Sequence, residues 1–280
     1  MNAIHDQFLE ERMALIRVPV EKWSEDQCSI CEDEVAEEVP VALEYNGISH
    51  AVMMASPTDL EDFALGFSLS EEILKSPSEL YECEVVVGAK GIQVQMQIAT
   101  ERFVSLKGRR RNLAGRTGCG LCGAETLEQA IRQPRVASGT SLFSAAQIYA
   151  GMRIMQSRQR LQHHTGATHA AAWMSADGIV DLVREDVGRH NALDKLIGAM
   201  AGEGRDFSTG AALITSRASY EMVQKSATMG IGFLVAISAP TSLAIQLAED
   251  ANVTLVGFVR KHSHVVYAQS HRLLRSPTAR

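Results

Sequence analysis

The sequence predicts an α/β protein with a smaller α+β unit at its N-terminal end. From about Thr165 onward, short apolar runs typical of buried strands alternate with helices, a pattern that indicates a layer with largely parallel central strands. Before that point the strands come in pairs separated by turn residues, as in hairpins. The 280 residues suffice for one large domain or two modest ones. We expect residues 1–135 to form the N-terminal α+β domain and residues 136–280 the C-terminal α/β domain.

Turn and cap residues justify the elements of the N-terminal unit. Asn46-Gly47 is a strong type I′ turn signal between two β-rich runs. Ser56 or Thr58 can cap the helix that follows. Cys83 lies in a second hairpin pattern, where we expect a small core residue. The predicted elements are a loose acidic arm over about the first 35 residues, a hairpin over 39–54, a helix over 56–74 and a hairpin over 82–98.

The elements of the C-terminal unit follow from the alternation of strands and helices. Asp177-Gly178 marks a hairpin turn between the first two strands, and after them strands and helices alternate. The predicted helices cover 126–133, 144–162, 189–200, 219–230 and 242–252, and the predicted strands cover 168–174, 179–186, 210–216, 233–238, 254–260 and 264–268.

Composition excludes several classes of protein. The formal net charge is −6, which does not favour nucleic-acid binding, and no apolar run approaches the roughly 18 residues of a membrane span. The start of the chain lacks the basic and apolar regions of a signal peptide. The five cysteines are an odd number, which argues against a disulfide scaffold and for a reducing cytoplasm.

The segment GRTGCGLCGAE, residues 115–125, carries the clearest chemical signal. Cys119 and Cys122 lie among glycines, and Arg116 and the arginines of 109–111 precede them. Neighbouring positive charge lowers the pKa of a thiol, and glycine lets other groups approach it. The segment therefore suits a reactive thiolate, or a persulfide with its negative charge on the outer sulfur.

A structural role for the pair is the main alternative from the residues alone. A C-x-x-C pair is about as typical of a metal clip as of a catalytic group, and Cys28 and Cys31 supply a second pair. Four thiolates make a complete zinc site. However, 87 residues separate Cys31 from Cys119, against roughly 15–20 in compact zinc ribbons. A thioredoxin-like site would need a strand that leads directly into a helix, whereas a glycine- and arginine-rich loop precedes this pair.

Six sequence blocks in order resemble the FdhD/NarQ family, the formate dehydrogenase accessory sulfurtransferases. The resemblance covers residues 38–267. The blocks are residues 39–73, GRTGCGLCG, THAAAWM, REDVGRHNALDKLIG, SRASYEMVQKSATMG, and SAPTSLAIQLAE with TLVGFVRK.

The resemblance implies a sulfur relay. Such a protein accepts persulfide sulfur from a cysteine desulfurase and transfers it to the molybdenum of the bis-molybdopterin guanine dinucleotide cofactor, and this step is required for formate dehydrogenase activity. Cys119 matches the sulfur-carrying cysteine and Cys122 a supporting position, which either releases sulfur by forming a disulfide or tunes the loop. The cofactor is cargo that a guanine nucleotide can mimic. Formate dehydrogenase is the acceptor, and a cytoplasmic homodimer is implied.

The resemblance also implies a cytidine-deaminase-like C-terminal domain and a cofactor-binding stretch. Deaminase chemistry itself is not expected, because His169 is followed by Ala170 and Ala171 where the zinc enzymes need H-x-E. The cofactor-binding stretch maps to Phe258, Val259, Arg260, Lys261, His262 and Ser263.

Three predicted helix starts add candidate anion sites, because helix N-termini and the carboxyl ends of parallel strands favour anionic ligands. Arg217 is the strongest candidate among them, since a guanidinium suits phosphate geometry. His169 and His190 are interpreted as structural histidines. The three starts contain Ser216, Arg217 and Ser219; Ser238, Thr241 and Ser242; and Gly188, Arg189 and His190.

Two other functions fit the same sequence. One is a cofactor chaperone without sulfur chemistry, which would gain no sulfur from a desulfurase. The other is a zinc-binding module built from four cysteines, which would contain zinc.

Overall fold

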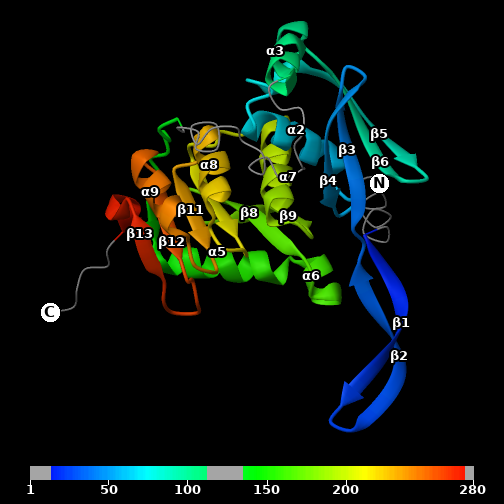
Figure 1. Ribbon diagram of the computed structural model, residues 1–280. Coiled ribbons are helices and arrows are strands. Elements are labelled where there is room, and N and C mark those ends of the chain that lie inside the picture. The colour runs from blue at the N-terminus through cyan, green and yellow to red at the C-terminus, as the bar shows by residue number, and fades with distance from the viewer. Residues whose placement is uncertain (1–13, 112–134, 275–280) are drawn as a thin grey trace, which may run out of the picture.

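A computed structural model describes residues 14–111 and 135–274, and it confirms the predicted α/β class (Figure 1). Its largest sheet has six strands in the order β13-β12-β11-β10-β8-β9. The neighbours β10, β11 and β12 run parallel, and the three remaining strands pair antiparallel. The bounds are β8 (His169–Ser175), β9 (Val180–Asp186), β10 (Gly210–Ile214), β11 (Phe233–Ala236), β12 (Thr254–Gly257) and β13 (Val265–Ala268).

Helices cover both faces of this sheet (Figure 1). Successive residues of β10 point to opposite faces. Leu213 packs with Ile148 and Met152 of α5 (Ala145–Ser157), while Ala212 belongs to the core cluster that contains Leu196. The helices on that second side are α7 (Arg189–Gly202), α8 (Tyr220–Thr228) and α9 (Ser242–Asp250). Within the described ranges, no helix has the length and hydropathy of a membrane span.

The predicted helix over 144–162 is two helices. Ser144 caps α5 in a capping box with Gln147. The chain leaves the helix at Arg158 and Gln159 and resumes as α6 (Arg160–Thr165). The predicted helix over 126–133 lies outside the described residues.

The N-terminal sheet has four strands in the order β4-β3-β6-β5 and contains both predicted hairpins. Asn46 (φ 46°) and Gly47 (φ 77°) both have positive φ, as a type I′ turn requires. Cys83 is half-buried, and burial raises the pKa of its thiol to about 11, which suits a packing role. The strands are β3 (Val39–Tyr45), β4 (Ile48–Ala55), β5 (Leu80–Gly88) and β6 (Gly91–Ile98).

The helix predicted over 56–74 starts later in the chain than expected. It is α2 (Leu60–Ser70), and Asp59 rather than Ser56 or Thr58 occupies its N-cap. Ser56 is instead directed toward the C-terminal half, where its Oγ accepts a hydrogen bond from the Val187 amide (3.1 Å). Ser56 therefore bonds a residue of the C-terminal half instead of capping α2.

A further helix, α3 (Thr100–Arg111), was not predicted. It contains the basic residues that we assigned to a loop, and it leads directly into the segment that the structure does not describe. The remaining short elements are η1 (Pro77–Glu79), β7 (Phe143–Ser144), η2 (Ser270–Arg272) and β14 (Leu273–Leu274).

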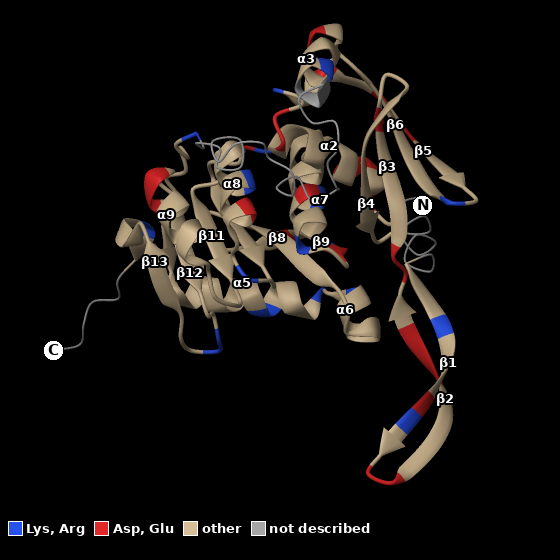
Figure 2. Cartoon of the chain, viewed as in Figure 1, with Lys and Arg blue, Asp and Glu red and all other residues tan. Residues whose placement is uncertain are grey.

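The acidic N-terminal arm is ordered over its described part, contrary to the prediction of a loose arm. β1 (Leu15–Ser24) and β2 (Gln27–Ala36) form an antiparallel ribbon that projects from the body and carries many acidic side chains (Figures 1 and 2). Cys28 and Cys31 are exposed on β2. Since they are three residues apart in a strand, their side chains point to opposite faces. This geometry disfavours a metal site that uses both thiols.

The two halves of the chain meet where α2 packs closely against α7. A Cβ atom on Gly66 would lie 1.8 Å from the Asp194 carbonyl oxygen, and one on Gly198 would lie 1.8 Å from that of Asp62. A single cluster of buried residues continues from the four-stranded sheet through these helices to the six-stranded sheet. The division at residue 135 stays a prediction.

Two buried ion pairs lie beside this contact. Lys195 Nζ is 2.7 Å from Asp186 Oδ2, and both side chains are fully buried. Lys225 Nζ is 3.0 Å from Asp194 Oδ2 and 2.9 Å from Glu71 Oε1. Burial alone would lower the pKa of Lys225, but these two carboxylates outweigh it and raise the pKa, so the ammonium stays charged.

We predict that Gly198→Ala lowers the free energy of unfolding by about 1–3 kcal/mol or more, because the added methyl group overlaps the α2 backbone. Gly202→Ala, in the same helix, is the matched control, since a Cβ there meets nothing within 4 Å. Urea unfolding of both variants measures the difference. Equal stabilities would contradict the close helix contact.

We also predict that Lys225→Met lowers the free energy of unfolding by about 3–5 kcal/mol, because it leaves the buried Asp194 carboxylate without its cation. The double variant Lys225→Met/Asp194→Leu removes both charges and should regain part of that loss. Thermal unfolding of the two variants is the measurement. A double variant less stable than the single one would show that the paired charges matter less than the packing.

Candidate functional site

The candidate site is the edge of the six-stranded sheet at which β10, β11 and β12 end. Three loops over 215–219, 237–241 and 258–264 meet there through main-chain hydrogen bonds. The Ala218 amide donates to the Ala239 carbonyl (3.2 Å), and the Phe258 amide donates to the Ser238 carbonyl (3.2 Å). The sheet therefore brings together residues from distant parts of the sequence, as expected for the carboxyl edge of parallel strands.

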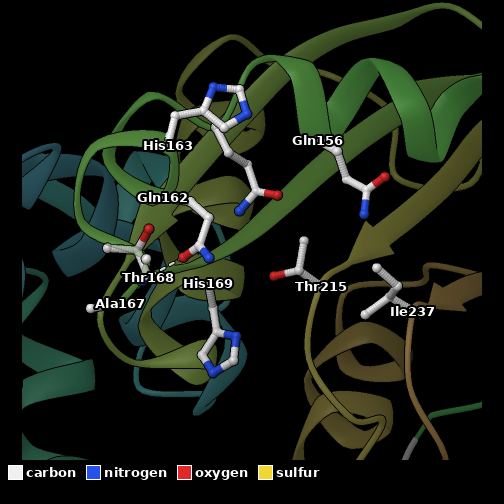
Figure 3. Close-up of a pocket in the computed structure, with 10 residues that line it drawn as sticks. Gln156, Gln162, His163, Ala167, Thr168, His169, Thr215 and Ile237 are labelled. Carbon is white, nitrogen blue, oxygen red and sulfur yellow. Dashed lines mark hydrogen bonds between the residues drawn. The ribbon is translucent and has the colours of Figure 1, made fainter. Parts of the chain in front are cut away.

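A pocket of about 520 Å³ opens beside these loops (Figure 3). Thr215 and Ile237 enter it from the ends of β10 and β11, and His169 enters it from the start of β8. The Thr168 amide donates to Gln162 Oε1 (2.8 Å), which ties α6 to the β8 side of the pocket. The lining residues are Gln156, Gln159, Gln162, His163, Gly166, Ala167, Thr168, His169, Thr215 and Ile237.

The pocket wall is largely uncharged. Burial and the nearby charge of Arg189 lower the pKa of His169, so its imidazole is neutral at neutral pH. Glu185 holds the wall in place by accepting hydrogen bonds from the Leu161 amide (3.0 Å) and from Thr168 Oγ1 (3.0 Å). Amide, imidazole and hydroxyl groups therefore offer hydrogen bonds to a neutral part of a ligand.

The predicted stretch from Phe258 to Ser263 lies in the loop after β12. Arg260 Nη1 donates to the Ile237 carbonyl (2.5 Å), and the Arg260 amide donates to the Ser263 carbonyl (2.8 Å). The first of these bonds connects the loop to a residue of the pocket wall. Lys261 and His262 are exposed, whereas the Val259 side chain is buried in the core and offers a ligand only its backbone.

The predicted residues after β10 differ in exposure and in their hydrogen bonds. Ser216 is buried, and its hydroxyl donates to the Arg217 carbonyl (3.0 Å). The Arg217 side chain is exposed and makes no ion pair with a described residue. Ser219 occupies the N-cap of α8, but its buried Oγ caps nothing and has no hydrogen-bond partner among the described residues. Thr241 does cap α9, since its Oγ1 accepts from the Ala244 amide (3.3 Å).

The starts of α7 and α8 lie side by side at the same edge. His190 Nε2 is 2.7 Å from Glu221 Oε2. Burial raises the pKa of Glu221, but the interaction with His190 outweighs it, and the pKa is lowered. His190 therefore has a structural partner, in line with its interpretation from the sequence, and the first turns of two helices are joined beside the loops.

Sequence reasoning missed most of the pocket wall. Gln156, Gln159 and Gln162 recur every three residues, a spacing that carries no known chemical motif, and the helix break between them was not predicted. Cys119 and Cys122 lie outside the described residues, so the structure gives no position for the thiols relative to this edge.

Comparison with known proteins agrees with this architecture. The sequence model of the FdhD/NarQ family matches residues 36–274. A sulfur carrier protein FdhD of Cupriavidus necator is 61% identical over 254 residues, which are 91% of this chain and 88% of that protein. The same-named protein of Bordetella petrii is 56% identical over 246 residues, 88% of each chain.

A solved structure shares the fold. A protein of Desulfotalea psychrophila, described as a formate dehydrogenase accessory protein, aligns with a TM-score of 0.73 and 23% identity over 93% of this chain and all of its own. From the family match and the close relatives together, the chain belongs to the FdhD/NarQ family.

Proposed function

We propose that this protein is a sulfurtransferase that takes persulfide sulfur from a cysteine desulfurase and transfers it to the molybdenum of the bis-molybdopterin guanine dinucleotide cofactor. The modified cofactor then activates formate dehydrogenase. The observation that carries the proposal is the motif GRTGCGLCG, which places Cys119 and Cys122 inside the segment that matches the family. The names of the close relatives support a role in sulfur transfer.

The first step is sulfur capture. The Cys119 thiolate attacks the outer sulfur of the donor persulfide, the sulfur–sulfur bond of the donor breaks, and the donor cysteine leaves as a thiolate that takes up a proton. A persulfide then forms on Cys119. Lys107 and the arginines of 109–111 at the end of α3 precede this segment, and their charge favours the thiolate and the persulfide anion over the protonated forms.

The second step is sulfur delivery. The outer sulfur leaves Cys119 as a neutral atom, the metal of the substrate supplies the two electrons that make it a sulfido ligand, and Cys119 returns as a thiolate. Cys122 supports this step. The substrate lies at the carboxyl edge of the sheet, where Arg217, Arg260 and Lys261 face its pyrophosphates. The neutral pocket takes an uncharged part of it, since about 520 Å³ falls in the usual range of ligand sites.

The partners in this proposal are the desulfurase and formate dehydrogenase, and the protein acts as a homodimer in the cytoplasm. A cofactor chaperone without sulfur chemistry and a zinc-binding module are the competing functions. The first would gain no sulfur from a donor, and the second would contain stoichiometric zinc.

We predict that incubation with a cysteine desulfurase and labelled cysteine adds one labelled sulfur atom to the peptide that contains Cys119. Mass spectrometry under non-reducing conditions measures this addition. Cys119→Ala should abolish it, because in this proposal Cys119 carries the sulfur and Cys122, the other thiol of the motif, only supports the transfer.

The matched control is the double variant Cys28→Ala/Cys31→Ala, which removes the two exposed thiols of the ribbon and should keep the full label on Cys119. Label that persists in Cys119→Ala, or that disappears in the double variant, would contradict the assignment. Zinc analysis of the same samples tests the zinc-binding alternative.

A further inference from the structure

The ribbon formed by β1 and β2 has no neighbour over most of its length. The two strands pair from Leu15 opposite Ala36 to Ser24 opposite Gln27, and within the described residues neither strand joins another sheet. Every residue over 21–33 is exposed, and the ribbon projects from the body (Figure 1). A two-stranded ribbon on its own is only marginally stable in water. A second molecule that covered it would therefore hold it in place.

One face of the ribbon carries large apolar side chains. Residues that oppose each other in an antiparallel pair lie on the same face, and faces alternate along each strand. Trp23 opposes Cys28 and Ile30 opposes Glu21, so Trp23 and Ile30 share a face. Trp23 is 64% exposed and Ile30 is 82% exposed. Tryptophan is enriched among the residues that carry most of the binding energy in protein interfaces. This face is therefore suited to contact with another protein.

The ribbon is also strongly acidic (Figure 2). Glu34 pairs with Arg17 and with His164 near the base. The other five carboxylates make no ion pair with a described residue, so their charge is available to attract a basic surface. Residues 15–36 contain the carboxylates Glu21, Glu25, Asp26, Glu32, Asp33 and Glu34 and the cations Arg17 and Lys22.

The base of the ribbon lies beside the candidate site. Glu34 Oε2 is 2.8 Å from Nδ1 of His164, a residue of α6. The same helix supplies Gln162 and His163 to the wall of the pocket. Figure 1 shows the ribbon extending past the end of the body at which α6 lies. A protein that receives the substrate from this edge would therefore meet the ribbon.

The charge of the substrate indicates which protein the ribbon fits. The cofactor carries two pyrophosphates, so an enzyme that accepts it needs positive charge around the entrance to its empty site. An acidic ribbon beside the edge from which the cofactor leaves is complementary to such an entrance. Two ribbons that met about a twofold axis would instead place like charges against each other.

We propose that the ribbon is a docking arm for formate dehydrogenase that has not yet received its cofactor. Trp23 and Ile30 form the apolar contact, and the unpaired carboxylates attract the basic entrance. The inference rests on the proposed function, in which formate dehydrogenase is the acceptor, and it deepens that function by naming the surface that recognises this partner. The ribbon acts in association and takes no part in the sulfur chemistry.

Biolayer interferometry with the full chain and the cognate formate dehydrogenase, purified without its cofactor, tests the role of the charges. Glu21→Gln/Glu32→Gln removes two carboxylates from the Trp23 face and keeps the side-chain size. The association rate constant should fall about 2- to 10-fold at low salt, and the difference should vanish near roughly 0.5 M salt, where screening is strong. Glu82→Gln/Glu84→Gln, on exposed positions of β5, is the matched control and should associate like the unsubstituted protein.

The same measurement tests the apolar contact. Trp23→Ala should weaken the Kd for the cofactor-free enzyme about 5- to 30-fold at low and at high salt, as truncation of a central interface residue does. Tyr81→Ala in β5 is the matched control, because Tyr81 is 66% exposed, and it should keep the affinity. All variants should accept labelled sulfur on Cys119 from the desulfurase at the unsubstituted rate, which shows that they are folded.

Four results would overturn the docking arm while sulfur capture stands. In the first, Trp23→Ala binds as tightly as the unsubstituted protein, or Glu21→Gln/Glu32→Gln associates as fast. In the second, the ribbon variants and the β5 controls weaken binding equally. In the third, light scattering shows that Trp23→Ala lowers the molar mass of the protein in solution, and the ribbon is then a contact between two copies of this chain. In the fourth, the unsubstituted protein does not bind the cofactor-free enzyme, and the acceptor assignment fails as well.

Failure of the proposed function gives a different result. In that case the unsubstituted protein gains no labelled sulfur from the desulfurase, whatever the ribbon variants do to the binding of formate dehydrogenase.

Discussion

The contact between α2 and α7 leaves no room for a side chain at Gly66 or Gly198, and the rest of the structure depends on it. Because the two backbones touch, α2 of the N-terminal unit becomes part of the layer that covers the six-stranded sheet. Lys225 and Asp194 are buried beside the contact, where a charge is tolerated only with its partner in place. Two sheets that are distant in sequence thus share one core.

The same contact positions the candidate site. Asp186, at the end of β9, accepts hydrogen bonds from the Ser56 amide (3.0 Å) and the Gly188 amide (2.7 Å), and it pairs with Lys195. It therefore ties the loop before α2 to the start of α7, and α7 starts at the edge where the substrate is proposed to bind. The motif with Cys119 follows α3 of the N-terminal unit. A relay between the motif and this edge requires the two units to keep a fixed relation, which the buried pairs provide.

Sequence patterns predicted most of the helices and strands, because turn residues and hydrophobic periodicity determine structure within short stretches of the chain. Asn46-Gly47 identified a hairpin, and the alternation after Thr165 identified the parallel strands. The errors arose where a distant partner decides the outcome. Ser56 accepts a hydrogen bond from the Val187 amide instead of capping α2. The acidic composition of the N-terminal arm predicted a loose segment, whereas β1 and β2 pair as an antiparallel ribbon. The glutamines of the pocket wall share no motif and meet only through the fold.

Native-state hydrogen exchange of the amides in α2, α7 and β10 tests most directly whether the helix contact joins the two sheets into one unit. If it does, the slowest amides of all three elements exchange with the same free energy of opening, equal to that of global unfolding, and all three respond equally to added urea. If the α2 amides exchange through a separate opening of lower free energy while β10 stays protected, the two halves unfold independently, and the contact does not hold the site as described.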